Sequence, residues 1–152
     1  MTIVEKIISS VQVALSEFDG GELVTFPVYY HDIETLNLIA DSADYPCAFF
    51  QLLTDGTLTN VNAQQRESVN VAIFFVEPSE FDFDAIENEE IIDRCKGRAA
   101  KWLQHVPLDR YIEVNEVVRT QRVYERFDGI LTGYGLIVTL TELQGVLYCA
   151  ND

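Results

Sequence analysis

The sequence predicts a single α+β domain over residues 1–152, with two main helices packed on a mostly antiparallel sheet that ends in a long C-terminal β-hairpin. Three observations lead to this fold class. Two segments carry apolar residues at three- and four-residue spacing, as amphipathic helices do. Other segments are short and rich in β-branched and aromatic residues, which is typical of strands. Finally, an Asp-Gly pair separates two long β-prone segments, which indicates a hairpin.

The first helix is expected from Thr2 to Phe18. Thr2 and Glu5 have the spacing of a capping box, and the pair Gly20-Gly21 is interpreted as the helix stop. The predicted apolar stripe contains Ile3, Val4, Ile7, Ile8, Val11, Leu15 and Phe18. The opposite, polar face contains Glu5, Lys6, Ser9, Ser10 and Gln12.

Two strands are expected after this helix, and their sequence signals differ in clarity. Leu23 to Tyr30 is β-prone but contains Pro27, so we expect a short edge strand there. Residues 31–40 fit either a connection or a short helix. Residues 46–53 are apolar and aromatic, as in a strand buried on both faces.

A turn is expected at Asp55-Gly56, with a strand extension over 57–62 and a polar loop over 62–66. Val69 to Val76 is the strongest strand signal in the first half of the chain, and Pro78 ends it.

The second helix is expected over 86–106. Asp84 and Glu87 have capping-box spacing, Glu90 and Arg94 form an i,i+4 pair, and Pro107 closes the helix. Its apolar stripe contains Ile91, Ile92, Cys95, Ala99, Trp102, Leu103 and Val106.

The C-terminal hairpin is expected to have strands at 111–127 and 130–143, joined by Asp128-Gly129. That register places Phe127 opposite Ile130 and Tyr124 opposite Gly133. The glycines at 133 and 135 are interpreted as a bulge, a bend or room for a cross-strand aromatic ring. Residues 119–134 mix charge with aromatic side chains, so we expect them to project beyond the core. A short final strand is expected at 146–149.

The formal net charge is −15, from 25 acidic and 10 basic residues. Such a charge disfavours binding to nucleic acid or to anionic lipid, because both depend on Lys and Arg. Residues 1–93 hold 18 acids and two bases, whereas residues 94–152 hold seven acids and eight bases. This asymmetry predicts either copies that meet head to tail or only a solvated acidic loop beside a basic helix end.

No catalytic constellation, metal site or cofactor motif is recognisable, so we expect a protein that is not an enzyme and has no cofactor. His31 and His105 lack a nearby partner at metal-ligand spacing. The acidic group Asp82, Asp84 and Glu87 lacks the glycine of a calcium loop. Three cysteines without a C-x-x-C pair suggest reduced, buried thiols in a cytosolic protein. We expect no signal peptide and no membrane span.

A long hairpin with uncovered edges is expected to be covered by another subunit. The residues near its turn are therefore the candidate subunit contacts: Arg119, Arg122, Tyr124, Arg126, Phe127 and Tyr134.

The order of elements, with a strand that opens Tyr45-Pro46, resembles that of tail terminator and head–tail joining (neck) proteins of tailed bacteriophages, in the Bacteroides-type prophage lineage. The resemblance implies a homo-oligomeric ring, commonly a hexamer, that caps the tail tube and contacts head-connector proteins. It implies a bacterial cytoplasmic location during assembly and then the virion neck. A different class also fits the charge, namely an acidic inhibitor or immunity-type protein that binds a basic enzyme.

Overall fold

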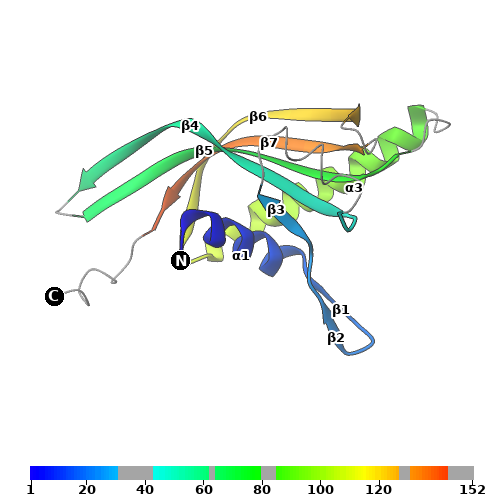
Figure 1. Ribbon diagram of the computed structural model, residues 1–152, viewed down its shortest axis with the longest axis horizontal. Helices are drawn as coiled ribbons and strands as arrows, with labels where there is room; N and C mark the ends of the chain where they lie inside the picture. Colours follow the sequence, from blue (N-terminus) through cyan, green and yellow to red (C-terminus); the bar gives the residue numbers. More distant parts are fainter. Residues whose placement is uncertain (31–42, 62–63, 80–84, 127–130, 144–152) are drawn as a thin grey trace.

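The computed structural model describes residues 1–30, 43–61, 64–79, 85–126 and 131–143. Figure 1 shows a long twisted sheet with helices α1 and α3 lying along one side of it. The sheet has five strands in the order β3-β4-β5-β7-β6, and all pairs except β3–β4 are antiparallel. The predicted α+β class, with two helices on a mostly antiparallel sheet and a C-terminal hairpin, is confirmed.

Helix α1 (Ile3–Leu15) begins as the sequence predicts, because the Oγ1 of Thr2 accepts a 3.2 Å hydrogen bond from the backbone N–H of Glu5. It ends earlier than predicted. β1 (Glu17–Asp19) and β2 (Glu22–Val24) form a separate antiparallel hairpin whose two-residue turn is Gly20-Gly21. Both glycines have positive φ, at 60° and 88°, as a type I′ turn requires. The interpretation of these glycines as a helix stop is therefore wrong.

Strand β3 (Val28–Tyr30) is the predicted short edge strand, now confined to the residues after Pro27. It pairs in parallel with the start of β4 (Cys47–Val61), which is buried from Cys47 to Phe50 as predicted. Residues 31–42 lie outside the described part of the chain.

The expected turn at Asp55-Gly56 is wrong, because β4 runs through it. The register with β5 (Gln64–Pro78) shifts between Leu52 and Gly56, so the Asp-Gly pair belongs to a bulge. At Gly56 a Cβ atom would lie 2.7 Å from the carbonyl oxygen of Ser68, so the strands approach too closely for a side chain. The polar stretch at 64–66, expected as loop, is strand.

Helix α3 (Ala85–His105) carries the predicted apolar stripe inward, and Pro107 follows in a short 3₁₀ turn, η1 (Val106–Leu108). Asp84 and the other residues of 80–84 lie outside the described chain. Helix α1 packs against α3 and against the sheet at β3. Two residues of its expected polar face, Lys6 and Ser10, are therefore buried. The Nζ of Lys6 lies 3.2 Å from a carboxylate oxygen of Glu142.

Alternation along the strands gives the sheet two buried faces. The face toward the helices includes Phe50, Ile73, Phe75 and Leu136 and packs against Trp102 and other residues of α1 and α3. The opposite face includes a smaller cluster, with Tyr29 and Tyr45 packed against it; its buried members are Cys47, Phe49, Val76 and Leu131.

The C-terminal hairpin consists of β6 (Ile112–Arg126) and β7 (Leu131–Glu142). Val123, not Tyr124, lies opposite Gly133, because a register shift falls between Val123 and Arg126. The predicted pairing of Tyr124 with Gly133 is therefore wrong, and the bulge that was one interpretation of these glycines lies on the neighbouring strand β6. A Cβ at Gly133 would lie 2.0 Å from a carbonyl oxygen of β5, while one at Gly135 would meet the ring of Phe74. The predicted turn, Asp128-Gly129, and the predicted final strand at 146–149 lie outside the described residues.

For the described residues of 119–134, namely 119–126 and 131–134, the expectation that they project beyond the core is also wrong. β7 lies between β5 and β6 in the sheet, and Val123 and Leu131 are buried. Instead, the far ends of β4 and β5 extend as a two-stranded ribbon (Figure 1). Pairing of β5 with β7 starts at Ser68, so the residues before it pair with β4 alone, and Leu58 on this ribbon is 66% exposed.

Candidate functional site

Strand β6 forms one edge of the sheet along its whole length. One side of this 15-residue strand pairs with β7, and the other side pairs with no strand in the described part of the chain. Its central residues Val117, Val118 and Arg119 are exposed. An uncovered edge of this length can accept a strand from another chain through main-chain hydrogen bonds. Among the described residues the opposite edge is also covered only in part, because β3 pairs with β4 only from Ala48 to Phe50.

Two of the candidate contact residues, Arg122 and Tyr124, meet Glu89 of helix α3. The guanidinium of Arg122 donates a hydrogen bond to Glu89 on α3 and another, of 2.9 Å, to the hydroxyl of Tyr124. The same hydroxyl donates to Glu89 over 2.8 Å. The hydrogen bonds from Tyr124 and then Arg122 hold the pKa of the Glu89 carboxyl below its ordinary value. This exposed triad attaches the edge strand to α3.

Of the other candidate residues, Arg119 and Tyr134 do not join this triad. Arg119 lies opposite Ile137, so it projects from the sheet face away from the helices, whereas Arg122, opposite Tyr134, projects toward them. Tyr134 is half-buried on the interior strand β7 and packs against the core. Arg126 pairs in register with Leu131, and Phe127 lies outside the described residues. The six candidates therefore do not form one surface.

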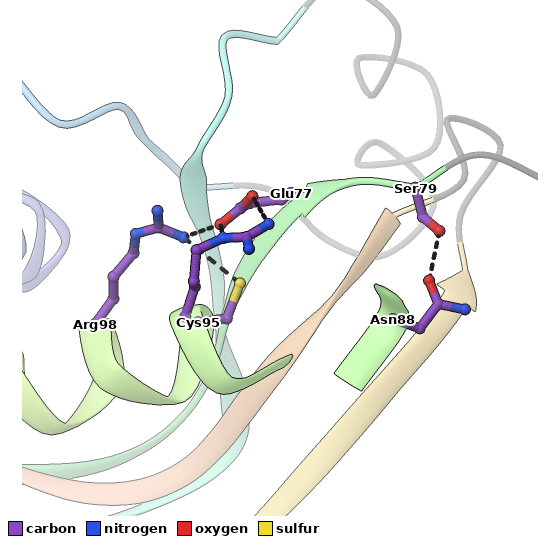
Figure 2. A network of polar contacts seen from close by, with 6 residues as sticks. Glu77, Ser79, Asn88, Cys95 and Arg98 are labelled. Carbon is purple, nitrogen blue, oxygen red and sulfur yellow. Dashed lines mark hydrogen bonds and ion pairs between the residues drawn. The ribbon is translucent and has the colours of Figure 1, made fainter. Parts of the chain in front are cut away.

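A second polar network joins the end of β5 to α3 (Figure 2). Arg94 donates two hydrogen bonds to the carboxylate of Glu77, of 3.1 and 3.0 Å, and Arg98 donates a third of 2.5 Å. Nearby, the buried Ser79 donates a 2.8 Å hydrogen bond to the side-chain oxygen of Asn88. Arg94 thus binds Glu77 of β5, in addition to its attraction to Glu90 one turn earlier on its own helix.

The environment of this network shifts the pKa of its groups. Burial raises the pKa of Glu77, but hydrogen bonds and charge from Arg94 and Arg98 outweigh that effect, so the net pKa lies below the ordinary value. Cys95 is fully buried, and burial together with the charge of Glu77 raises the pKa of its thiol to about 12. Burial likewise raises the pKa of Cys47. Both thiols are therefore protonated at neutral pH.

An open cleft of about 850 Å³ lies beside this network. On one side is α3, which contributes Arg94, Gly97, Arg98 and Lys101 at the spacing of one helix face. The other side consists of the β1–β2 hairpin and the chain around Pro27 and Pro46. All the described basic side chains that line the cleft therefore come from one face of α3.

In the described residues, no group of three or more His, Cys, Asp or Glu side chains is arranged to hold a metal ion. His105 ends α3, while His31, Asp82 and Asp84 lie outside the described chain. No described helix is both long and apolar enough to cross a membrane. No protein-family model matches this chain, and no curated protein matches it.

Reasoning from the sequence missed both the β1–β2 hairpin and the cleft. The signal for the hairpin was present, because Gly20-Gly21 separates two short segments that each contain apolar and acidic residues. The basic face of α3 was also visible as Arg94, Arg98 and Lys101 at helical spacing. The cleft itself depends on how distant segments pack, which no local pattern encodes.

Proposed function

We propose that this protein is a non-enzymatic virion assembly protein, a ring-forming tail terminator or head–tail connector that caps a phage tail tube. The observation that carries the proposal is the 15-residue edge of β6, which no strand in the described ranges of the chain covers. Folded proteins usually cover or interrupt such edges, and a neighbouring subunit is one means of covering them. The resemblance in element order supplies the kind of assembly.

The net negative charge favours this proposal over a function in which the protein binds DNA. A net charge of −15 would let DNA pass through a ring without adhering, because carboxylates repel phosphate. The proposed partners are further copies of this chain, the tail tube and the head-connector proteins. The proposed location is the bacterial cytoplasm during assembly and the virion neck afterwards.

The first test measures the molar mass of the purified protein by light scattering and sedimentation over a range of concentrations, alone and with tail tubes. A ring of defined mass, alone or on the tube end, is expected. A strict monomer that binds neither tubes nor connectors would contradict the proposal. Stable co-purification with a basic enzyme, without self-assembly, would instead favour an acidic inhibitor.

The edge itself is tested by Val118→Lys. Val118 is 51% exposed on β6, so a lysine there should leave the fold intact while placing a charge in the middle of the edge. Assembly is expected to weaken by about tenfold or more, which corresponds to about 1.4 kcal/mol. Val13→Lys is the matched control, because Val13 is 64% exposed on α1, away from that edge. Equal assembly of both variants would exclude β6 as the contact.

A further inference from the structure

The β1–β2 hairpin stands away from the body of the protein (Figure 1). All residues from Glu17 to Thr25 are exposed, and apart from the pairing of β1 with β2 no extensive contact holds the hairpin to another described element. Phe18 and Leu23 lie directly opposite each other, so they share one face, with exposed fractions of 78% and 58%. An isolated two-stranded hairpin is only marginally stable in water, and this one exposes its largest apolar pair.

The charges of the hairpin and of the cleft are opposite in sign. The hairpin carries Glu17, Asp19 and Glu22 and no basic residue. Among the described residues, none of these three carboxylates forms an ion pair, although the basic face of α3 borders the same cleft. Within one copy, therefore, the acidic hairpin and the basic helix face each other across the cleft without joining.

The helix face leaves room for an occupant. A Cβ atom at Gly97 would meet no atom within 4 Å, so the middle of the basic face is open. Arg94 and Arg98 are held by Glu77, whereas Lys101 is exposed and forms no ion pair in the described part of the chain. The cleft also has an apolar side, to which Phe26 and Pro46 contribute. It thus combines positive charge with apolar surface.

We propose that the β1–β2 hairpin of one copy docks in the cleft of a second copy. Its carboxylates would meet the basic face of α3 around Gly97 and Lys101, and its Phe18–Leu23 face would cover the apolar side. This inference rests on the proposed self-assembly and adds a second contact to the β6 edge. Opposite charges steer the encounter, while the two large apolar side chains supply most of the affinity.

A photo-crosslinking amino acid at position 97 tests the geometry, in an equal mixture of isotopically heavy and light protein. Cross-linked peptides are expected to join position 97 to residues 17–24, with heavy–light pairs in the proportion given by random mixing. Cross-links confined to heavy–heavy and light–light pairs would show that the hairpin closes on its own chain. That result, or the absence of cross-links to the hairpin, would overturn the inference.

Complementation between two variants provides a second, independent readout. Glu22→Lys with Leu23→Asp disables the hairpin without changing a residue that lines the cleft, and Gly97→Glu with Lys101→Glu disables the cleft. Each variant alone is expected to lose association by about tenfold or more. Their mixture is expected to recover one-to-one association, because each retains the surface that the other lacks. Mixtures no stronger than the separate variants would overturn the inference.

The matched controls are Val13→Asp on α1 and Lys96→Glu, which is exposed on α3 but does not line the cleft. Both should assemble like the wild type. If Val118→Lys abolishes assembly while the hairpin and cleft variants assemble normally, the inference fails and the proposed function survives. If the wild-type chain never assembles, alone or on tail tubes, both fail together.

Discussion

The indole N–H of Trp102 donates a 3.0 Å hydrogen bond to the hydroxyl oxygen of Ser10, 92 positions earlier in the chain. Both residues are buried, and the bond joins α3 to α1 inside the core. The Trp102 ring also packs near Phe75 of the sheet, with ring centroids 6.4 Å apart. One side chain thus links both helices to the helix-facing side of the sheet.

Trp102→Ala is therefore expected to lower the free energy of unfolding by about 3–5 kcal/mol, because it removes a fully buried ring and leaves a cavity. Ser10→Ala isolates the polar part of the contact. It leaves a buried indole N–H without an acceptor, which costs about 1–3 kcal/mol. Urea unfolding monitored by circular dichroism measures both. A near-zero loss for Trp102→Ala would mean that α3 does not pack on the core through this residue.

Glu77→Gln is expected to lower stability by about 1–3 kcal/mol at neutral pH, because it removes the charge that holds Arg94 and Arg98. The pKa of Glu77 is lower in the folded protein than its ordinary value of 4.5. Its contribution is thus fully present above pH 4.5 and is lost as pH falls through the folded pKa. Wild-type and variant unfolding curves should converge in acid. A difference that persists unchanged at low pH would contradict this account.

Glu89→Gln provides the comparison for Glu77. Glu89 also accepts hydrogen bonds from an arginine, but its side chain is 44% exposed, against 15% for Glu77. Solvent screens exposed ion pairs, so the loss should be smaller than for Glu77→Gln. Equal losses of stability in the two variants would show that the greater burial of Glu77 does not strengthen its ion pairs.

Gly133→Ala and Gly97→Ala are expected to act in opposite directions. At Gly133 the new methyl group would lie 2.0 Å from the Phe75 carbonyl oxygen, in a backbone that cannot yield easily. A loss of about 1–3 kcal/mol or more is expected. At Gly97 the methyl group meets open space, and alanine favours the helix by about 1 kcal/mol. Thermal unfolding of the two variants checks the signs, and a destabilised Gly97→Ala would refute the open position.

Cys47 and Cys95 are expected to resist thiol reagents in the folded protein. The thiolate is the reactive species, and burial raises the pKa of both thiols, that of Cys95 to about 12. In a variant whose third cysteine, Cys149, is replaced by serine, neither thiol should be labelled at pH 8 until denaturant is added, after which both should react. Rapid labelling of the native protein would mean that one of these sites opens to solvent.

The sequence predicted those parts of the fold that depend on local pattern. The cap at Thr2, the buried stripe of α3 and the end of β5 at Pro78 follow from capping chemistry, helical periodicity and the missing N–H of proline. The errors arise where tertiary packing decides. Asp55-Gly56 carries a turn signal, yet pairing with β5 converts it into a bulge within a long strand.

The candidate site was less predictable than the fold. Arg122 and Tyr124 do lie together, but their partner is Glu89 of the same chain. Arg119 was placed with them because it lies on the same stretch near the predicted turn, yet it is three residues from Arg122 on an unbroken part of the ladder, so the two side chains project from opposite faces. The register was predicted only in part, because a bulge places Val123 instead of Tyr124 opposite Gly133. The sites of bulges depend on the fit between neighbouring strands, and the residues of one strand do not determine them.

Those same irregularities determine which strands β6 can accept. Its pairing with β7 shifts register three times in 15 residues, so its free edge is bent and strongly twisted. A flat strand from an unrelated unfolded chain could form only a few successive main-chain hydrogen bonds with this edge, because its amides would soon fall out of register with those of β6. Fibrillar stacking, which needs a long straight template, is thereby disfavoured. A strand that pairs with β6 must therefore follow the same bends, which restricts the possible partner strands more than the exposed amides alone would.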